Sequence, residues 1–315
     1  MSKRESPVKQ SVALIAGPTA SGKSDLAVNL AIGLQDQGRR AVVINADSAQ
    51  VYSDLRILSA RPSADDMRGI EHRLFGTWDG ATACSAADWA AAAKREISLL
   101  HAENAVPILV GGTGLYMRTL LDGIAPVPEI DPEVRAVVRN MTAGELYAAL
   151  GVEDAERASV LDAADVQRLS RALEVVRSTG HPLSHWQQQM EGGIADEIDL
   201  HPLVLLPDRD WLYERCDRRF SLMMEQGALG EVEALLARSL DASLPVMRAI
   251  GVPEIASHLK GELALDEAIA AGQQATRNYA KRQYTWFRRQ PPENWPRCES
   301  ENYTWSTHFA RLLRY

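Results

Sequence analysis

A glycine-rich segment near the N-terminus has the residue types that bind phosphate. Four residues separate Gly17 from Gly22, and Lys23 and Ser24 follow, which matches the P-loop pattern Gly-x4-Gly-Lys-[Ser/Thr]. Glycine allows the backbone to wrap around an anion, and amide groups at the start of a helix then point toward it. Lys23 supplies positive charge, and the Ser24 hydroxyl is suited to holding Mg²⁺ beside two phosphates. We therefore predict that residues 17–24 bind a diphosphate or a nucleotide.

Two further candidate residues follow other apolar segments. Asp47 comes shortly after the segment 41–44, and Thr113 follows the segment 106–110. A P-loop ATPase usually places an acid after an apolar strand to help bind Mg²⁺, but the segment 106–110 is followed by Gly-Gly-Thr. The carboxylate of Asp47 could accept a proton from a hydroxyl group, as in a small-molecule kinase, or from a different acceptor. It could also be a helix cap or a turn residue.

The elements that must position these residues follow from the apolar pattern. Apolar segments typical of buried strands occupy 12–16, 41–44, 106–110 and 203–206, and helical patterns separate them. Strands that are apolar on both faces and alternate with helices indicate a parallel sheet covered on two sides. The predicted fold class is therefore α/β, a P-loop NTPase-like parallel sheet with helices on both faces. Ligands of such sheets bind at the carboxyl ends of the strands.

The composition changes near residues 124–128, where two prolines indicate a stiff linker. The following residues, to about position 200, are mostly helical by pattern. We predict a first part of the core at 1–126, a small helical insertion domain at 127–200, and a second part of the core with C-terminal helices at 201–315.

Charge and cysteine content restrict the functional classes. The chain has 34 Lys and Arg against 42 Asp and Glu, a net charge of −8, which taken alone disfavours a nucleic-acid partner. Its three cysteines form no Cys-x-x-Cys pair, so no zinc site is expected. No apolar run approaches the roughly 20 residues that span a bilayer. A cytoplasmic, monomeric protein without a membrane partner is expected.

Five motifs together resemble those of tRNA dimethylallyltransferases. They lie in that family's order at residues 17–24, 47–52, 111–116, 167–174 and 281–288. The resemblance implies transfer of a dimethylallyl group from dimethylallyl diphosphate to an adenosine of tRNA. The acceptor would be the exocyclic amine of adenosine 37, adjacent to the anticodon on its 3′ side, and diphosphate would be released.

The resemblance also implies roles for individual residues. The diphosphate would be bound by Gly17, Pro18, Thr19, Ala20, Ser21, Gly22, Lys23 and Ser24, with Mg²⁺ held at Ser24. Asp47 would be the general base, Thr113 would act in the reacting channel, and Arg219 would be a second cation on the diphosphate. The contacts to the tRNA anticodon stem-loop would be Asp47, Ser48, Ala49, Gln50, Arg135, Gln167, Arg168, Leu169, Ser170, Arg171, Arg248, Lys281, Arg282 and Arg288.

The segment 277–289 supports an RNA partner independently, because it has five basic residues, interleaved aromatic residues and no acid. The alternative for this segment is a core-facing helix with a solvated basic side. Other functions compatible with the phosphate loop are a small-molecule kinase, a prenyltransferase of free adenine nucleotides, and a nucleotide-gated binding module without catalysis.

Overall fold

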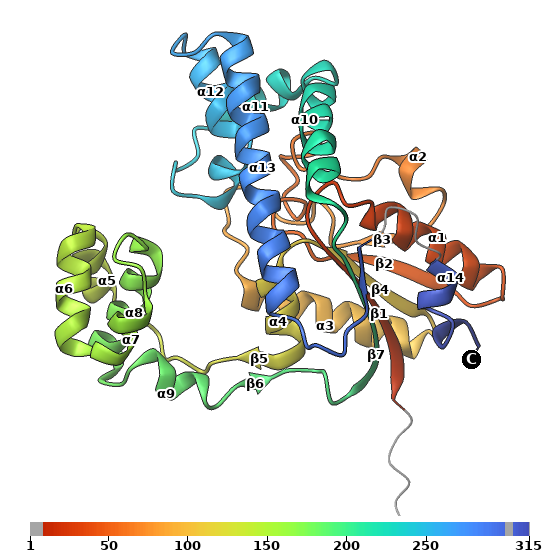
Figure 1. Ribbon diagram of the computed structural model, residues 1–315, viewed down its shortest axis with the longest axis horizontal. Coiled ribbons are helices and arrows are strands. Elements are labelled where there is room, and N and C mark those ends of the chain that lie inside the picture. The colour runs from red at the N-terminus through yellow and green to blue at the C-terminus, as the bar shows by residue number, and fades with distance from the viewer. Residues whose placement is uncertain (1–8, 300–304, 315) are drawn as a thin grey trace, which may run out of the picture. The chain divides into compact units, whose positions relative to one another are not determined.

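The computed structural model describes residues 9–299 and 305–314 of the chain (Figure 1). The chain forms two compact units. The larger unit consists of the residues up to Leu120 together with those from Ala195 onward, and the smaller unit is Leu121–Ile194. The sequence placed the insertion at 127–200, whereas strand β7 of the larger unit already begins at Ile198.

The larger unit is built on one six-stranded sheet. Its strands lie in the order β3-β2-β4-β1-β7-β8, and every neighbouring pair is parallel. Their bounds are β1 Gln10–Ala16, β2 Ala41–Asn45, β3 His72–Arg73, β4 Val106–Gly111, β7 Ile198–Leu205 and β8 Arg297–Cys298. The four strands expected from sequence are all present, and the predicted parallel α/β fold is confirmed.

Helices cover both faces of this sheet, as predicted. On one face, α1 (Lys23–Gln35) buries Leu26, Leu30 and Leu34 against β1, β2 and β4, and C-terminal residues near α14 (Trp305–His308) and η2 (Leu312–Arg314) join the same core. On the other face, α3 (Ala86–Ala102) packs on β2 and β4. The indole N–H of Trp89 there donates a hydrogen bond to the carbonyl oxygen of Asn45 at 2.8 Å.

Most of the other helices of the larger unit follow β7. They are α10 Arg209–Glu225, α11 Ala228–Ala237, η1 Pro245–Arg248, α12 Val252–Leu259 and α13 Leu265–Arg289. The long helices α10 and α13 lie side by side (Figure 1). Besides α1 and α3, the part of the chain before strand β5 contains helices α2 (Ala64–Met67) and α4 (Gly114–Asp122). No helix within residues 9–299 and 305–314 is long and apolar enough to cross a bilayer.

The smaller unit is a helical bundle beside one short strand pair. Its helices are α5 Pro132–Arg139, α6 Ala143–Glu153, α7 Ala155–Val160, α8 Val166–Thr179 and α9 Leu183–Gln187. The antiparallel strands are β5 (Gly123–Ile124) and β6 (Glu191–Gly192). Val138, Leu146, Leu150, Leu169 and Leu173 form its apolar core. The residues expected to form a stiff linker therefore begin inside strand β5.

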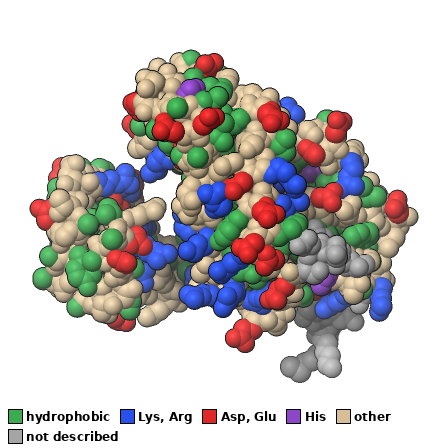
Figure 2. Space-filling view, turned by 45° about the horizontal axis from the view of Figure 1, so that its top comes forward, with side chains coloured by type: hydrophobic (Ala, Val, Ile, Leu, Met, Phe, Trp, Pro, Cys, Tyr) green, Lys and Arg blue, Asp and Glu red, His purple; other side chains and the backbone are tan. Residues whose placement is uncertain are grey.

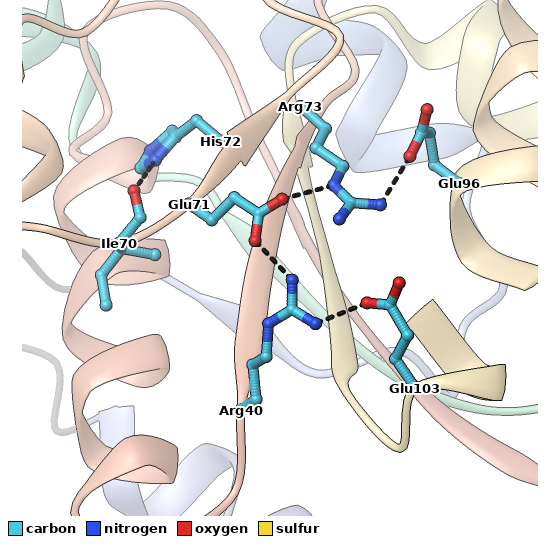
Figure 3. A network of polar contacts seen from close by, with 7 residues as sticks. All are labelled: Arg40, Ile70, Glu71, His72, Arg73, Glu96 and Glu103. Carbon is cyan, nitrogen blue, oxygen red and sulfur yellow. Dashed lines mark hydrogen bonds and ion pairs between the residues drawn. The ribbon is translucent and has the colours of Figure 1, made fainter. Parts of the chain in front are cut away.

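An exposed ion-pair network joins the ends of neighbouring elements at one edge of the sheet (Figure 3). Arg40, just before β2, contacts Glu71 at 2.6 Å and Glu103 at 2.5 Å. Arg73 of β3 contacts Glu71 at 2.7 Å and Glu96 of α3 at 2.8 Å. Arg40, Glu71 and Glu103 are well exposed to solvent, so the network adds little stability in spite of its short distances.

Candidate functional site

The three predicted strand-end segments meet at the carboxyl edge of the sheet. The backbone N–H of Thr113, after β4, donates to the carbonyl oxygen of Ala46, after β2, at 3.1 Å. The Thr113 hydroxyl oxygen accepts from the backbone N–H of Ser48 at 2.9 Å. A Cβ atom at Gly111 would lie 2.0 Å from the Ala46 carbonyl oxygen, so this approach requires glycine.

The phosphate loop connects β1 directly to α1. Gly22, with φ 88°, precedes the first helical residue, and the Lys23 ammonium group donates to the Pro18 carbonyl oxygen at 2.8 Å. Burial lowers the pKa of Lys23 to about 8, and the nearby Asp47 carboxylate opposes this shift. The buried Ser21 hydroxyl has no hydrogen-bond partner among the described residues, while Ser24 is exposed in the first turn of α1. Residues 17–22 thus connect β1 to α1, and Lys23 and Ser24 are the first two residues of the helix.

Helix α10 supplies cations to this loop. The Arg219 guanidinium donates to the Thr19 hydroxyl oxygen at 3.4 Å, and the Arg215 Nε–H donates to the Ala20 carbonyl oxygen at 2.9 Å. Burial lowers the pKa of Arg219, while Cys216 and Asp47 oppose the shift. The structure therefore places Arg219 beside the phosphate loop, the location predicted for a second cation.

Gln283 of α13 joins the phosphate loop to the glycine turn after β4, and the sequence did not single it out. Its side-chain Oε1 accepts from the Thr19 backbone N–H at 2.7 Å, and its Nε2 donates to the Gly112 carbonyl oxygen at 2.8 Å. The side chain is 5% exposed. Ala280 and Phe287 are buried on the same side of α13. A polar glutamine between two buried apolar positions of the helix is the sequence feature that could have indicated a buried hydrogen-bonding residue.

A cavity of about 310 Å³ lies next to the loop and the Asp47 segment, entirely within the larger unit. One part of its wall is polar or charged: Thr19, Asp47, Ser48, Arg219, Tyr279 and Arg282. Another part is apolar: Leu58, Phe220, Met223, Pro245 and Ile250. The cavity can therefore hold a ligand that has an anionic group and an apolar group.

Asp47 and Tyr279 form much of the polar wall. One Asp47 carboxylate oxygen accepts from the backbone N–H groups of Ala49 and Gln50 at 2.9 and 3.4 Å, which fixes the turn after β2. Asp47 is thus a turn residue as well as a partly buried cavity residue. Burial raises the pKa of Tyr279, whose hydroxyl contacts Thr113 and Ser48. The Arg282 guanidinium carbon lies 5.7 Å from the centre of the Tyr279 ring, which is within the range of a cation–π contact.

The predicted RNA contacts of the larger unit lie in different environments. Arg248 and Arg282 line the cavity, and Lys281 and Arg288 are exposed on α13. The Gln50 side-chain amide instead donates to the carbonyl oxygens of Ser59 and Ala60, at 3.0 and 2.9 Å, and supports the protein's own loop.

The other predicted RNA contacts lie on α5 and α8 of the smaller unit. Gln167, Arg168 and Arg171 are exposed on α8, and Arg168 pairs with Asp165 at 3.4 Å. Although Arg171 is exposed, partial desolvation of its guanidinium group lowers its pKa, and the positive charge of Arg135 on α5 contributes in the same direction.

The prediction that Leu169 contacts RNA is wrong for its side chain, which is 0% exposed. The neighbouring Ser170 is partly buried on the same helix. Leu169 belongs to the apolar core of the smaller unit because it shares a helical face with Leu173.

A parallel sheet with a phosphate loop after its first strand and a cavity at its carboxyl edge defines a P-loop-type α/β protein. The chain belongs to the IPP transferase family, whose family model matches residues 50–290.

Similar proteins support this membership over nearly the whole chain. A "tRNA dimethylallyltransferase" of Erythrobacter litoralis is 64% identical, covering 98% of this chain and 97% of the relative. One of Novosphingobium aromaticivorans is 67% identical, covering 89% and 99%. The crystal structure of a tRNA isopentenylpyrophosphate transferase from Bacillus halodurans has a TM-score of 0.69 at 30% identity, covering 97% and 95%. A eukaryotic dimethylallyltransferase acting on tRNA has a TM-score of 0.74 at 27% identity, covering 88% and 69%.

Proposed function

We propose that this protein transfers a dimethylallyl group from dimethylallyl diphosphate to the exocyclic amine of adenosine 37 in tRNA. The observation that carries the proposal is the cavity in which the phosphate loop, Arg219 and Asp47 converge beside an apolar wall. Relatives at 64 and 67% identity that bear the name tRNA dimethylallyltransferase support the same reaction.

The diphosphate of the donor is assigned to the phosphate loop. Lys23 and Arg219 would balance its negative charge, and loop amides would add hydrogen bonds at the helix N-terminus. As the bond between the allylic carbon and the diphosphate oxygen breaks, its electron pair stays on that oxygen. The same cations stabilise the charge that develops there.

Mg²⁺ fits this part of the site. The exposed Ser24 hydroxyl would be its protein ligand, and no cluster of three or more His, Cys, Asp or Glu side chains suited to a metal occurs in residues 9–299 or 305–314. Mg²⁺ commonly takes one or two protein ligands and completes its shell with water and substrate phosphates. When bound, it would neutralise charge on the leaving diphosphate.

Asp47 is assigned as the general base. The adenine amine is a weak nucleophile because its lone pair is delocalised into the ring. As its nitrogen forms a bond to the allylic carbon, one N–H proton would pass to the Asp47 carboxylate. The hydrogen bonds from Ala49 and Gln50 hold that carboxylate in place, and Thr113 fixes the adjacent Ser48. Reaction at this position requires the adenine to leave its stack and enter the cavity.

Basic side chains near the cavity and on α8 would position the tRNA backbone. Figure 2 shows Lys and Arg side chains gathered in patches on the visible face, next to acidic ones. A net charge of −8 is therefore compatible with an RNA substrate, because the local distribution of charge decides binding.

The decisive assay combines the protein with dimethylallyl diphosphate, Mg²⁺ and unmodified tRNA, and follows diphosphate and prenylated adenosine. Equal amounts of both products are expected. ATP consumption with a phosphorylated product, or no transfer, would reject the proposal in favour of a kinase or a binding module.

The variant Asp47→Asn tests the general base, since an amide oxygen preserves the acceptor of the turn hydrogen bonds. We expect the turnover rate to fall by about 10²-fold or more, with tRNA affinity unchanged. Asp88→Asn is the matched control, because Asp88 also accepts backbone and hydroxyl hydrogen bonds, from Ser85, but caps α3 and does not line the cavity. Loss of tRNA binding in Asp47→Asn would show instead that Asp47 anchors the RNA.

A further inference from the structure

One face of α10 carries both a cation for the diphosphate and part of the apolar cavity wall. Cys216, Arg219, Phe220 and Met223 line the cavity at positions i, i+3, i+4 and i+7. Arg219 contacts Thr19 of the phosphate loop. Met223 follows one helical turn later, about 6 Å along the axis. The apolar wall therefore starts directly beside the group that would hold the diphosphate.

The Phe220 ring is held by two glycines on other helices. A Cβ atom at Gly272, in the interior of α13, would lie 2.0 Å from the Phe220 Cζ atom. A Cβ atom at Gly251, just before α12, would lie 3.3 Å from its Cε2 atom. Phe220 is 2% exposed, so its ring is enclosed by neighbouring residues where it lines the cavity.

Gly272 is informative because its backbone does not need glycine. It is absent from the residues with positive φ, and a helix-interior glycine costs about 1 kcal/mol relative to alanine. The close contact with the ring explains the glycine, since any side chain there would push Phe220 toward the cavity. Gly251, by contrast, has φ 95° and requires glycine for its backbone alone.

We propose that Phe220, seated against Gly272 and Gly251, limits the length of the prenyl chain that the cavity accepts. This inference rests on the proposed function. With the diphosphate beside Thr19 and Arg219 and the allylic carbon facing Asp47, the hydrocarbon must follow the apolar wall. About 310 Å³ must hold this chain and the adenine together. A ten-carbon geranyl chain would therefore overlap the Phe220 ring, while the five-carbon dimethylallyl chain fits in front of it.

Two substitutions change this wall in opposite directions. Phe220→Leu and Phe220→Ala remove ring atoms and lengthen the apolar space, whereas Gly272→Ala pushes the ring into it. The measurement is kcat/KM for geranyl diphosphate and for dimethylallyl diphosphate with the same tRNA. We expect the geranyl-to-dimethylallyl ratio to rise at least tenfold in Phe220→Ala and less in Phe220→Leu. In Gly272→Ala we expect kcat/KM to fall with both donors.

Phe309→Leu is the control for the general effect of losing a buried ring. Phe309 is 1% exposed and packs in the core beneath α1, outside the cavity lining. The geranyl-to-dimethylallyl ratio of kcat/KM in Phe309→Leu should equal that of the unchanged protein. An equal ratio in Phe220→Ala and Phe309→Leu, or efficient use of geranyl diphosphate by the unchanged protein, would overturn the proposal.

Donor binding without tRNA provides a second measurement. The thermal stabilisation produced by geranyl diphosphate, relative to that by dimethylallyl diphosphate, should rise in Phe220→Leu and stay constant in Phe309→Leu. Constant relative stabilisation in both variants would reject Phe220 as the limit. If Phe220→Ala does not fold, Phe220→Leu decides. Absence of transfer from dimethylallyl diphosphate by the unchanged protein would instead contradict the proposed function, a result separate from these ratios.

Discussion

The substitution Gln283→Leu tests whether one buried amide holds the phosphate loop in its working position. Leucine occupies a similar volume but makes neither of the two hydrogen bonds of Gln283. The Thr19 backbone N–H would lose a 2.7 Å bond, and the Gly112 carbonyl oxygen would lose a 2.8 Å bond. The leucine side chain would offer neither backbone group a replacement hydrogen bond.

The magnitude follows from the burial of these two partners. An unsatisfied buried polar group costs about 1–3 kcal/mol. The bond to Gly112 is buried and the bond to Thr19 is partly buried, so the total loss of unfolding free energy should be about 2–5 kcal/mol. Freed from this restraint, the loop would hold the diphosphate less well. We expect kcat/KM for the donor to fall between about 10- and 100-fold.

Urea unfolding and donor kinetics provide the assay, and Gln273→Leu is the matched control on the same helix. The Gln273 amide donates longer bonds, 3.3 Å to the Asp217 carbonyl oxygen and 3.2 Å to the Ser221 hydroxyl oxygen, in a partly buried place. Its replacement should cost about 1 kcal/mol and leave kcat/KM unchanged. If Gln283→Leu unfolded at the same urea concentration as Gln273→Leu and kept full activity, the reasoning about Gln283 would be refuted.

Four further results are expected. Inhibition of the transfer reaction by added diphosphate should weaken as the pH rises above about 8, because buried Lys23 loses its proton there. Diphosphate itself also titrates, and the same measurement on Lys23→Met allows that contribution to be subtracted. Arg40 and Arg73 lower the pKa of Glu71, so its contribution to stability is present above the unfolded pKa and disappears as acid protonates it. Glu71→Gln should therefore lower the urea midpoint slightly at pH 7, and by progressively less as the pH falls below the unfolded pKa. Arg168→Ala should lower tRNA affinity and reduce the slope of log affinity against log salt by about 1, in binding titrations at several salt concentrations, whereas Leu169→Ala should destabilise the smaller unit by about 2–5 kcal/mol.

Much of the framework could be predicted because it depends on local patterns. The Gly-x4-Gly-Lys-Ser spacing and the apolar strands placed the phosphate loop, Asp47 and Thr113 at strand ends, and parallel strands bring such ends together. The prediction failed at Leu169, where a motif was treated as a block although helical periodicity places this residue on the buried face. Its neighbours Arg168 and Arg171 lie on the exposed side of the same helix.

The contacts of Gln283 and Phe220 could not be predicted, because each depends on segments that are distant in sequence. A glutamine within a basic, aromatic-rich helix does not indicate which backbone groups it reaches. Gly272 has no turn pattern around it, so only the packed neighbour explains why this helix position lacks a side chain. Pair contacts of this kind arise from the packing of α10 against α13, which no single segment encodes.

Helix α13 connects these observations, because successive residues on one side of it reach different parts of the site. Tyr279 contacts Thr113 and Ser48, and four residues later Gln283 holds Thr19 and Gly112. A rigid helix thus fixes the distance between the turn that carries the assigned base and the loop assigned to the leaving group. The proposed transfer depends on that distance, so we expect a helix whose basic residues indicated RNA binding in the sequence also to set the geometry of the proposed reaction.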